Sequence, residues 1–152
     1  MFGDLFLSSC PGMGKDLLGD IQIIKDLNIK CLISLVEENE LTHLGAKDLF
    51  KELDKNNIKW IHFKIINFGI PNLNQYDELN SHIKTISQRI LNGDNIYIHC
   101  MAGLGRTGMI AALILTKLGL SAQQSIKVIR DNRPGSIETE AQENFVCEFR
   151  LN

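Results

Sequence analysis

The chain has 152 residues, of which 44% are hydrophobic and 22% are charged, and this composition is typical of one globular domain. It excludes a disordered chain, a collagen-like fibre and a small disulfide scaffold. The formal charge of −2 excludes a broad basic surface for nucleic acid or an anionic membrane. No apolar run approaches the roughly 18 residues that span a bilayer. We therefore expect a single domain over residues 1–152 that binds neither nucleic acid nor membrane.

The first half of the chain alternates helical and strand-like patterns. Apolar residues at helical spacing predict a helix over 17–27, and the apolar run 29–36 predicts a buried strand. A second helix is expected to begin at Thr42 as N-cap and to continue to residue 53. The β-rich segment 58–66 then predicts another strand.

The second half continues the alternation. A helical stripe over 73–90 is expected to end at Gly93, and 96–99 predicts a short strand. Residues 107–118 are apolar nearly all round, which indicates a central buried helix. Two capping boxes predict the starts of the last two helices, at Ser121 with Gln124 and at Thr139 with Gln142. The predicted class is α/β, with a central, mainly parallel sheet covered by helices on both faces.

The four cysteines are scattered along the chain, at Cys10, Cys31, Cys100 and Cys147. They form no CxxC pair and no Cys/His cluster at zinc spacing, so we expect no metal site. Free cysteines of this kind are typical of a reducing compartment, and we expect a cytoplasmic protein.

The most informative segment is HCMAGLGRTG at residues 99–108, which follows a predicted strand and opens a predicted helix. It therefore lies at the carboxyl edge of the sheet, where α/β proteins bind ligands. Glycines at 103 and 105 allow the chain to curl so that backbone N–H groups point inward, and the next helix adds its positive end. The predicted anion cradle consists of Met101, Ala102, Gly103, Leu104, Gly105 and Arg106.

Cys100 begins this cradle, and the surrounding donors are expected to favour its thiolate. Arg106 can hold two phosphate oxygens, and the Thr107 hydroxyl can donate to the sulfur. This combination predicts nucleophilic attack on phosphorus and a cysteinyl-phosphate intermediate, with no cofactor. The alternative is a buried structural cysteine beside an ordinary glycine turn. That alternative is disfavoured because several residue types are specified together between a strand and an apolar helix.

At these residues the sequence resembles the cysteine-dependent protein tyrosine/dual-specificity phosphatase superfamily. More narrowly, it is similar to the kinase-associated (cyclin-dependent kinase inhibitor 3-like) and small atypical dual-specificity subgroups. The resemblance covers almost the whole chain. Besides the signature, its matching segments are 10–12, 40–41, 66–71 and 133–139.

The resemblance implies that Cys100 is the nucleophile, that Arg106 clamps the phosphate and that Thr107 donates to the sulfur. His99 would orient the loop, or it is a satisfied core histidine. Gln142 would position the hydrolytic water, or it caps the last helix. Lys15 lies in a segment that approaches the active site in relatives, although an ordinary solvated lysine is equally compatible with the sequence.

One position departs from the superfamily pattern. Relatives place an aspartate, the general acid, in the loop before Pro71, and a gapless count puts Asn67 there. An amide does not donate that proton, and losing general-acid help typically costs about 10²–10⁴-fold in rate. The acid is thus weakened, or it is relocated to a neighbour. The candidate neighbours are Asp77, Glu78 and Glu138.

The sequence thus predicts a monomeric protein phosphatase that acts on phosphotyrosine and, more slowly, on phosphoserine or phosphothreonine. Phosphate, sulfate and vanadate are expected to inhibit it by occupying the cradle. Two alternatives stay open. One is a catalytically impaired protein that binds phosphoproteins, which Asn67 favours. The other is a phosphatase for lipid or RNA phosphates, which the neutral side chains of Met101, Ala102 and Leu104 disfavour.

Overall fold

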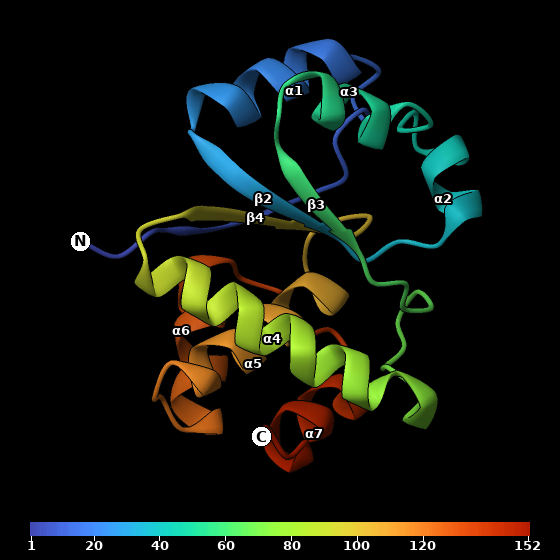
Figure 1. The fold of residues 1–152 in the computed structure, drawn as a ribbon. Coiled ribbons are helices and arrows are strands. Elements are labelled where there is room, and N and C mark those ends of the chain that lie inside the picture. Colours follow the sequence, from blue (N-terminus) through green and yellow to red (C-terminus); the bar gives the residue numbers. More distant parts are fainter.

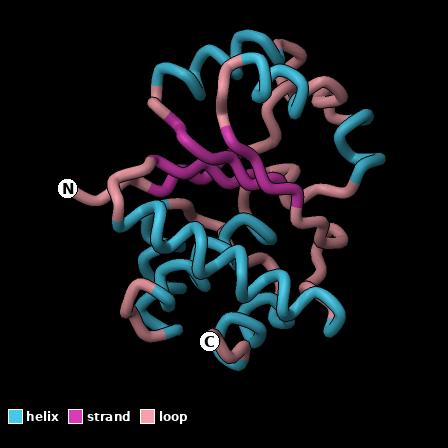
Figure 2. The backbone as a smooth tube through the Cα atoms, in the orientation of Figure 1, coloured by secondary structure: helices cyan, strands magenta, loops and turns pink.

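The computed structural model describes all 152 residues and is built around one four-stranded parallel sheet. The strand order is β1-β4-β2-β3. The strands are β1 (Leu5–Ser8), β2 (Ile29–Ser34), β3 (Lys59–His62) and β4 (Asn95–His99). Figure 2 shows the strands as one central layer between helices. The predicted α/β class with a parallel sheet is confirmed.

Helices cover both faces of the sheet, as predicted (Figure 1). On one side lie α1 (Leu17–Asp26) and α3 (Leu49–Lys55), with α2 (Glu38–His43) beyond the ends of the strands. The other side holds α4 (Tyr76–Leu91), which follows the short 3-10 turn Leu73–Gln75, and α5 (Gly105–Lys117), α6 (Ala122–Asn132) and α7 (Glu140–Glu148). None of these helices has both the length and the apolar character that crossing a bilayer requires.

Helix α5 lies at the centre of the layer formed by α4, α5, α6 and α7, and its residues are buried from Gly105 to Ile114. It contacts β1 and β4 on one side and α4, α6 and α7 on the others. A helix enclosed on all sides needs an apolar circumference, which is the pattern that the sequence shows. Its first residue lies directly after the loop that begins at Cys100, so the packing of α5 fixes where that loop ends.

The predicted helix boundaries hold where local capping chemistry sets them. Ser121 accepts a hydrogen bond from the backbone of Gln124 at 3.1 Å, and Thr139 accepts one from Gln142 at 3.1 Å. Gly93 has φ +99°, a conformation that favours glycine, and it follows the end of α4 as expected.

Two expectations about the first half of the chain were wrong, and one strand was not predicted. Thr42 does not begin a helix, because the segment forms two short helices separated around Gly45, whose φ is +74°. The strand expected over 58–66 is shorter, since only Lys59–His62 pair with β2. Strand β1 carries no strong period-2 signal and was not predicted; it pairs along the free edge of β4.

The register of the sheet brings three strand ends together. His99, the last residue of β4, lies opposite Ser8 of β1 on one side and Ser34 of β2 on the other. The chain that leaves β4 therefore emerges between two neighbouring strands at the carboxyl edge. This is the place where the sequence puts the cradle.

Because α5 is enclosed, we expect Leu113→Ala to lower the free energy of unfolding by about 2–5 kcal/mol. Leu113 is fully buried. Leu18 of α1 is 66% exposed, and Leu18→Ala is the matched control, expected to change stability by less than about 0.5 kcal/mol. Urea denaturation measures both. Equal losses for the two variants would contradict the enclosed position of α5.

Candidate active site

The loop between β4 and α5 presents its backbone N–H groups without acceptors in the protein. No N–H from Met101 to Arg106 donates to a backbone or side-chain oxygen. Consecutive free N–H groups at the start of a helix are typical of an anion-binding site. Each N–H can donate to an oxygen of the anion, and the positive end of the helix dipole attracts the negative charge as well.

The carbonyl groups of the same loop are all bonded to the protein. His99 Nδ1 lies 3.0 Å from the carbonyl oxygen of Cys100, and the backbone N–H of Cys10 donates to Met101 at 2.9 Å. The Leu104 carbonyl accepts from two backbone N–H groups, at 2.9 and 3.1 Å. Because each peptide unit has its oxygen and its N–H on opposite sides, these bonds keep the N–H groups on the inner side of the loop.

Arg133, at the end of α6, holds the two remaining carbonyls. Its Nη2 donates to Ala102 O at 2.9 Å and its Nε donates to Gly103 O at 2.6 Å. In the sequence, Arg133 stands out only as part of a segment that matches the superfamily. No local pattern could reveal its role, because these contacts join residues about thirty positions apart.

Gly103 is required by the curvature of the loop. Its φ is +74°, and a Cβ on it would lie 2.2 Å from the backbone oxygen of Ser8. Any side chain here would therefore collide with β1. Gly105 is restricted by side chains instead, because a Cβ there would lie 2.4 Å from Glu138 Oε1 and 3.0 Å from Gln142 Oε1.

Arg106 is buried and held in place by Glu40, which follows the N-terminus of α2. Two hydrogen bonds of 2.8 Å join the guanidinium to both carboxylate oxygens, and a third of 2.9 Å reaches the Ile65 carbonyl. A guanidinium has five N–H groups, so its Nε–H and one Nη2–H stay free for a ligand. The Glu40 carboxylate is itself oriented by the Glu37 backbone N–H at 2.8 Å.

Arg106 and Glu40 each stabilise the charged form of the other. Burial by itself raises the pKa of Glu40 and lowers that of Arg106. The hydrogen bonds between the two outweigh burial, so the pKa of Glu40 is lowered and that of Arg106 is raised. Both groups are therefore charged at neutral pH, and the positive charge of Arg106 also acts on the neighbouring Cys100.

Cys100 is almost fully buried, and so are two polar side chains of the same segment, His99 and Thr107. Neither the Thr107 hydroxyl nor His99 Nε2 has a hydrogen-bond partner, although both are buried. Burial lowers the pKa of His99 to about 4, so the ring is neutral at pH 7 and donates from Nδ1 to the Cys100 carbonyl. The Thr107 hydroxyl is left free to donate to another acceptor.

Two other cysteines, Cys10 and Cys31, are buried as well. Burial, followed by the negative charge of Cys100, raises the pKa of Cys10 to about 12. Burial also raises the pKa of Cys31 to about 11. Both remain protonated thiols at neutral pH, and a protonated thiol is a poor nucleophile.

The loop after β3 is attached at two points to residues of the candidate site. Arg106 binds it at Ile65, and Gln142 Nε2 donates to the Gly69 carbonyl at 3.1 Å. Asn67 lies between these two attachments, half-buried, and its amide makes no hydrogen bond with the protein. Gln142 Oε1 also accepts from the backbone N–H groups of Glu138 and Thr139, so this buried side chain both caps α7 and ties the loop.

Residues 12–151 match the model of the protein family described as "Dual specificity phosphatase, catalytic domain". The chain belongs to this family. It is 29% identical to cyclin-dependent kinase inhibitor 3 of Rattus norvegicus over 155 residues, which span 95% of this chain and 72% of that protein. The Homo sapiens protein of the same name is equally similar, with the same coverage.

Solved structures agree with the sequence relatives. A structure of kinase associated phosphatase, with its catalytic site cysteine substituted by serine, has a TM-score of 0.86 and 27% identity, covering 96% of this chain and 85% of that one. The active form of Tk-PTP has a TM-score of 0.79 and 27% identity, covering 97% and 91%. The predicted superfamily and enzyme class are confirmed: this is a cysteine-dependent dual-specificity phosphatase domain.

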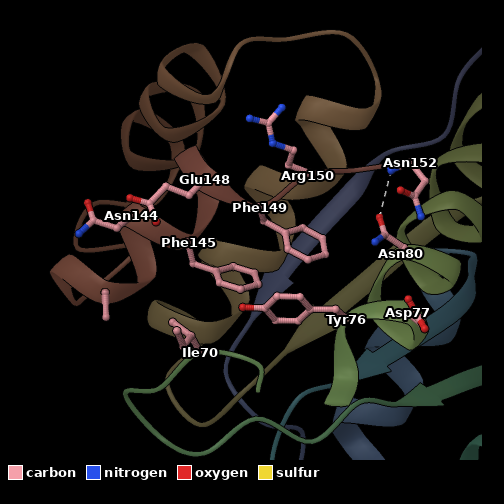
Figure 3. A pocket seen from close by; sticks show the side chains of 11 residues that line it. Ile70, Tyr76, Asp77, Asn80, Asn144, Phe145, Glu148, Phe149, Arg150 and Asn152 are labelled. Atoms are coloured by element: carbon pink, nitrogen blue, oxygen red, sulfur yellow. Dashed lines mark hydrogen bonds between the residues drawn. The ribbon is translucent and has the colours of Figure 1, made fainter. Parts of the chain in front are cut away.

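The remaining candidate side chains of the phosphatase domain lie in different surroundings. Lys15 is exposed, has φ +67° and forms no ion pair. Glu78 is paired with His82 at 3.1 Å. Asp77 lines an open groove between α4 and α7 that Figure 3 shows. Of the three carboxylates predicted as relocated acids, the structure brings Glu138 against the cradle, at Gly105.

We expect Glu40→Gln to destabilise the domain by about 3 kcal/mol, because Arg106 would keep a buried charge without its counter-ion. A carboxylate whose folded-state pKa is lowered contributes stability above its unfolded pKa of about 4.3 and loses it as pH falls through the folded value. The difference between wild type and variant should therefore be constant above about pH 5 and shrink below pH 4.

Glu38→Gln on the same helix is the control, since the exposed Glu38–Lys64 pair should contribute at most about 1 kcal/mol. Chemical denaturation between pH 3 and pH 7 measures both variants. A Glu40→Gln loss no larger than that of Glu38→Gln would contradict the role of the buried pair.

Proposed function

We propose that this domain hydrolyses phosphate monoesters on proteins, with Cys100 as nucleophile and a cysteinyl-phosphate intermediate. The observation that carries the proposal is the orientation of the loop: its N–H groups from Met101 to Arg106 are free, while its carbonyls are bonded on the other side. With the free edge of Arg106, these donors can surround the oxygens of a tetrahedral dianion next to the sulfur.

In the first step the Cys100 thiolate attacks phosphorus, so the S–P bond forms as the bond to the leaving oxygen breaks. The free N–H groups and Arg106 stabilise the charge on the equatorial oxygens in the transition state. The leaving oxygen takes a proton and departs as an alcohol or a phenol. In the second step water attacks phosphorus, the S–P bond breaks and Thr107 donates a hydrogen bond to the departing thiolate.

The loop that contains Asn67 supplies no proton, because a side-chain amide is not an acid at neutral pH. Substrates with acidic leaving groups depend least on protonation. Phosphotyrosine should therefore be hydrolysed faster than phosphoserine or phosphothreonine. This preference is a consequence of leaving-group chemistry and requires no deep recognition pocket.

The proposed substrate is a phosphorylated protein, which the relatives named kinase associated phosphatase and cyclin-dependent kinase inhibitor 3 favour. The cradle side chains Met101, Ala102 and Leu104 are neutral, which disfavours a highly anionic lipid or RNA phosphate. We further propose a monomer in the cytoplasm; four free cysteines are compatible with a reducing compartment. Phosphate, sulfate and vanadate should compete with substrate.

A second candidate is a module that binds phosphoproteins without turnover. The observation that favours it is Asn67, which removes the usual proton donor from the loop. The two candidates agree on the anion cradle and differ in whether the phosphoryl group is transferred to sulfur.

Hydrolysis of p-nitrophenyl phosphate by wild type and Cys100→Ser separates the candidates. We expect turnover by wild type under reducing conditions, a phosphorylated Cys100 that can be trapped by rapid acid quench, and loss of at least about 10³-fold activity in the serine variant. Cys147→Ser is the control, because Cys147 is exposed and lies on the outer part of α7. Phosphate binding by a folded, reduced wild type without turnover would contradict the enzyme and support the binding module.

A further inference from the structure

Glu138 places a carboxylate against the end of the anion cradle. Its Oε1 lies 2.4 Å from the point where a Cβ on Gly105 would be, so it rests over the first residue of α5. Gly105 is among the residues whose N–H groups lack an acceptor. The Glu138 carboxyl group therefore lies against the backbone of a residue that contributes one of the free N–H groups of the cradle.

The backbone around Glu138 is fixed to the cradle. The preceding residue, Ile137, donates its N–H to the Leu104 carbonyl at 3.1 Å and accepts a hydrogen bond from Arg130 Nη2 at 3.0 Å. Ile137 is buried and has φ +59°, a strained conformation for a β-branched residue. Such strain persists only where the surroundings impose it, and it is concentrated at functional sites. Here it determines the direction in which the chain enters residue 138.

The peptide unit between Ile137 and Glu138 is bound at its N–H as well. The Glu138 N–H donates to Gln142 Oε1 at 3.0 Å, and Gln142 Nε2 donates to the Gly69 carbonyl of the loop that contains Asn67. Glu138 therefore joins the same hydrogen-bonded unit as the loop from which the usual acid is missing. Its carboxylate, in contrast, is exposed and forms no hydrogen bond or ion pair with the protein.

The other carboxylates near this end of the sheet are already engaged. Both oxygens of Glu40 are bound by Arg106, and Asp20 accepts from the Gly12 backbone at 2.8 Å. Glu143 is paired with Arg130 at 3.0 Å. Glu138 is the carboxylate at the cradle that can exchange a proton without breaking a bond to the protein.

We propose that Glu138 is the general acid of this phosphatase, in place of residue 67, and the general base of the second step; this inference rests on the proposed phosphatase function. The substrate dianion would favour the protonated form of a carboxyl group beside it, because two like charges repel. As the S–P bond forms and the bond to the leaving oxygen breaks, that oxygen takes the carboxyl proton. In the second step, the resulting carboxylate takes a proton from the attacking water, and the thiolate leaves.

The test compares Glu138→Gln with wild type on phenyl phosphate and on p-nitrophenyl phosphate. Phenol is the poorer leaving group, so kcat/KM with phenyl phosphate should fall about 10²–10⁴-fold, and the loss with p-nitrophenyl phosphate should be smaller. The decline of kcat at high pH, where the acid loses its proton, should disappear in the variant. Glu140→Gln removes an exposed carboxylate two residues away and should change both substrates by less than about twofold.

The double variant Asn67→Asp/Glu138→Gln adds a rescue. An acid restored at position 67 should recover turnover of phenyl phosphate and restore the decline at high pH. Wild-type turnover that depends on Cys100, combined with an unchanged leaving-group dependence in Glu138→Gln, would overturn this inference and leave the phosphatase function standing. Absence of Cys100-dependent turnover in wild type would overturn the phosphatase function itself.

Discussion

The orientation of the peptide units between Cys100 and Arg106 is the constraint on which the site depends. An isolated loop of this composition could turn its carbonyl oxygens toward the ligand as easily as its N–H groups. Here the carbonyls are held by Arg133, by the chain at Cys10 and by the backbone around α5. Hydrogen bonds within the protein therefore set the orientation of the anion site, and little reorganisation is needed when charge develops on the phosphoryl oxygens.

The second requirement is a cation that stays charged while buried. Arg106 satisfies it through Glu40, which lies 66 residues away in the sequence and whose carboxylate is aligned by the N-terminus of α2. The same guanidinium binds the Ile65 carbonyl, so the ion pair also fixes one end of the loop with Asn67. Removing Glu40 would leave the charge of Arg106 unpaired in the protein interior, which makes the pair a structural as well as an electrostatic element.

Much of this arrangement could be predicted from the sequence because its determinants are local. The signature at 99–108, the capping boxes at Ser121 and Thr139 and the apolar circumference of α5 each act over a few residues. The break between α2 and α3 was missed because apolar spacing alone cannot show that the chain turns at Gly45. Strand β1 has only four residues and depends on pairing with β4, a contact made across 91 positions.

The side chains that complete the site could be predicted least well. Arg133, Glu40 and Glu138 reach the cradle from three separate elements, and neither their spacing nor their residue type distinguishes them from surface charges. Among Asp77, Glu78 and Glu138, the sequence offered no criterion. Their positions in the structure distinguish them. Asp77 lines the groove of Figure 3 and Glu78 is paired with His82, whereas Glu138 lies at Gly105 of the cradle.

The most direct measurement of the central claim is site-resolved alkylation by iodoacetamide at pH 6.5, with and without inorganic phosphate. If the inward N–H groups and Arg106 ionise the sulfur, buried Cys100 will react faster than exposed Cys147, and phosphate will protect it. Faster reaction at Cys147, or no protection of Cys100 by phosphate, would show that the loop neither activates the thiol nor binds an anion beside it.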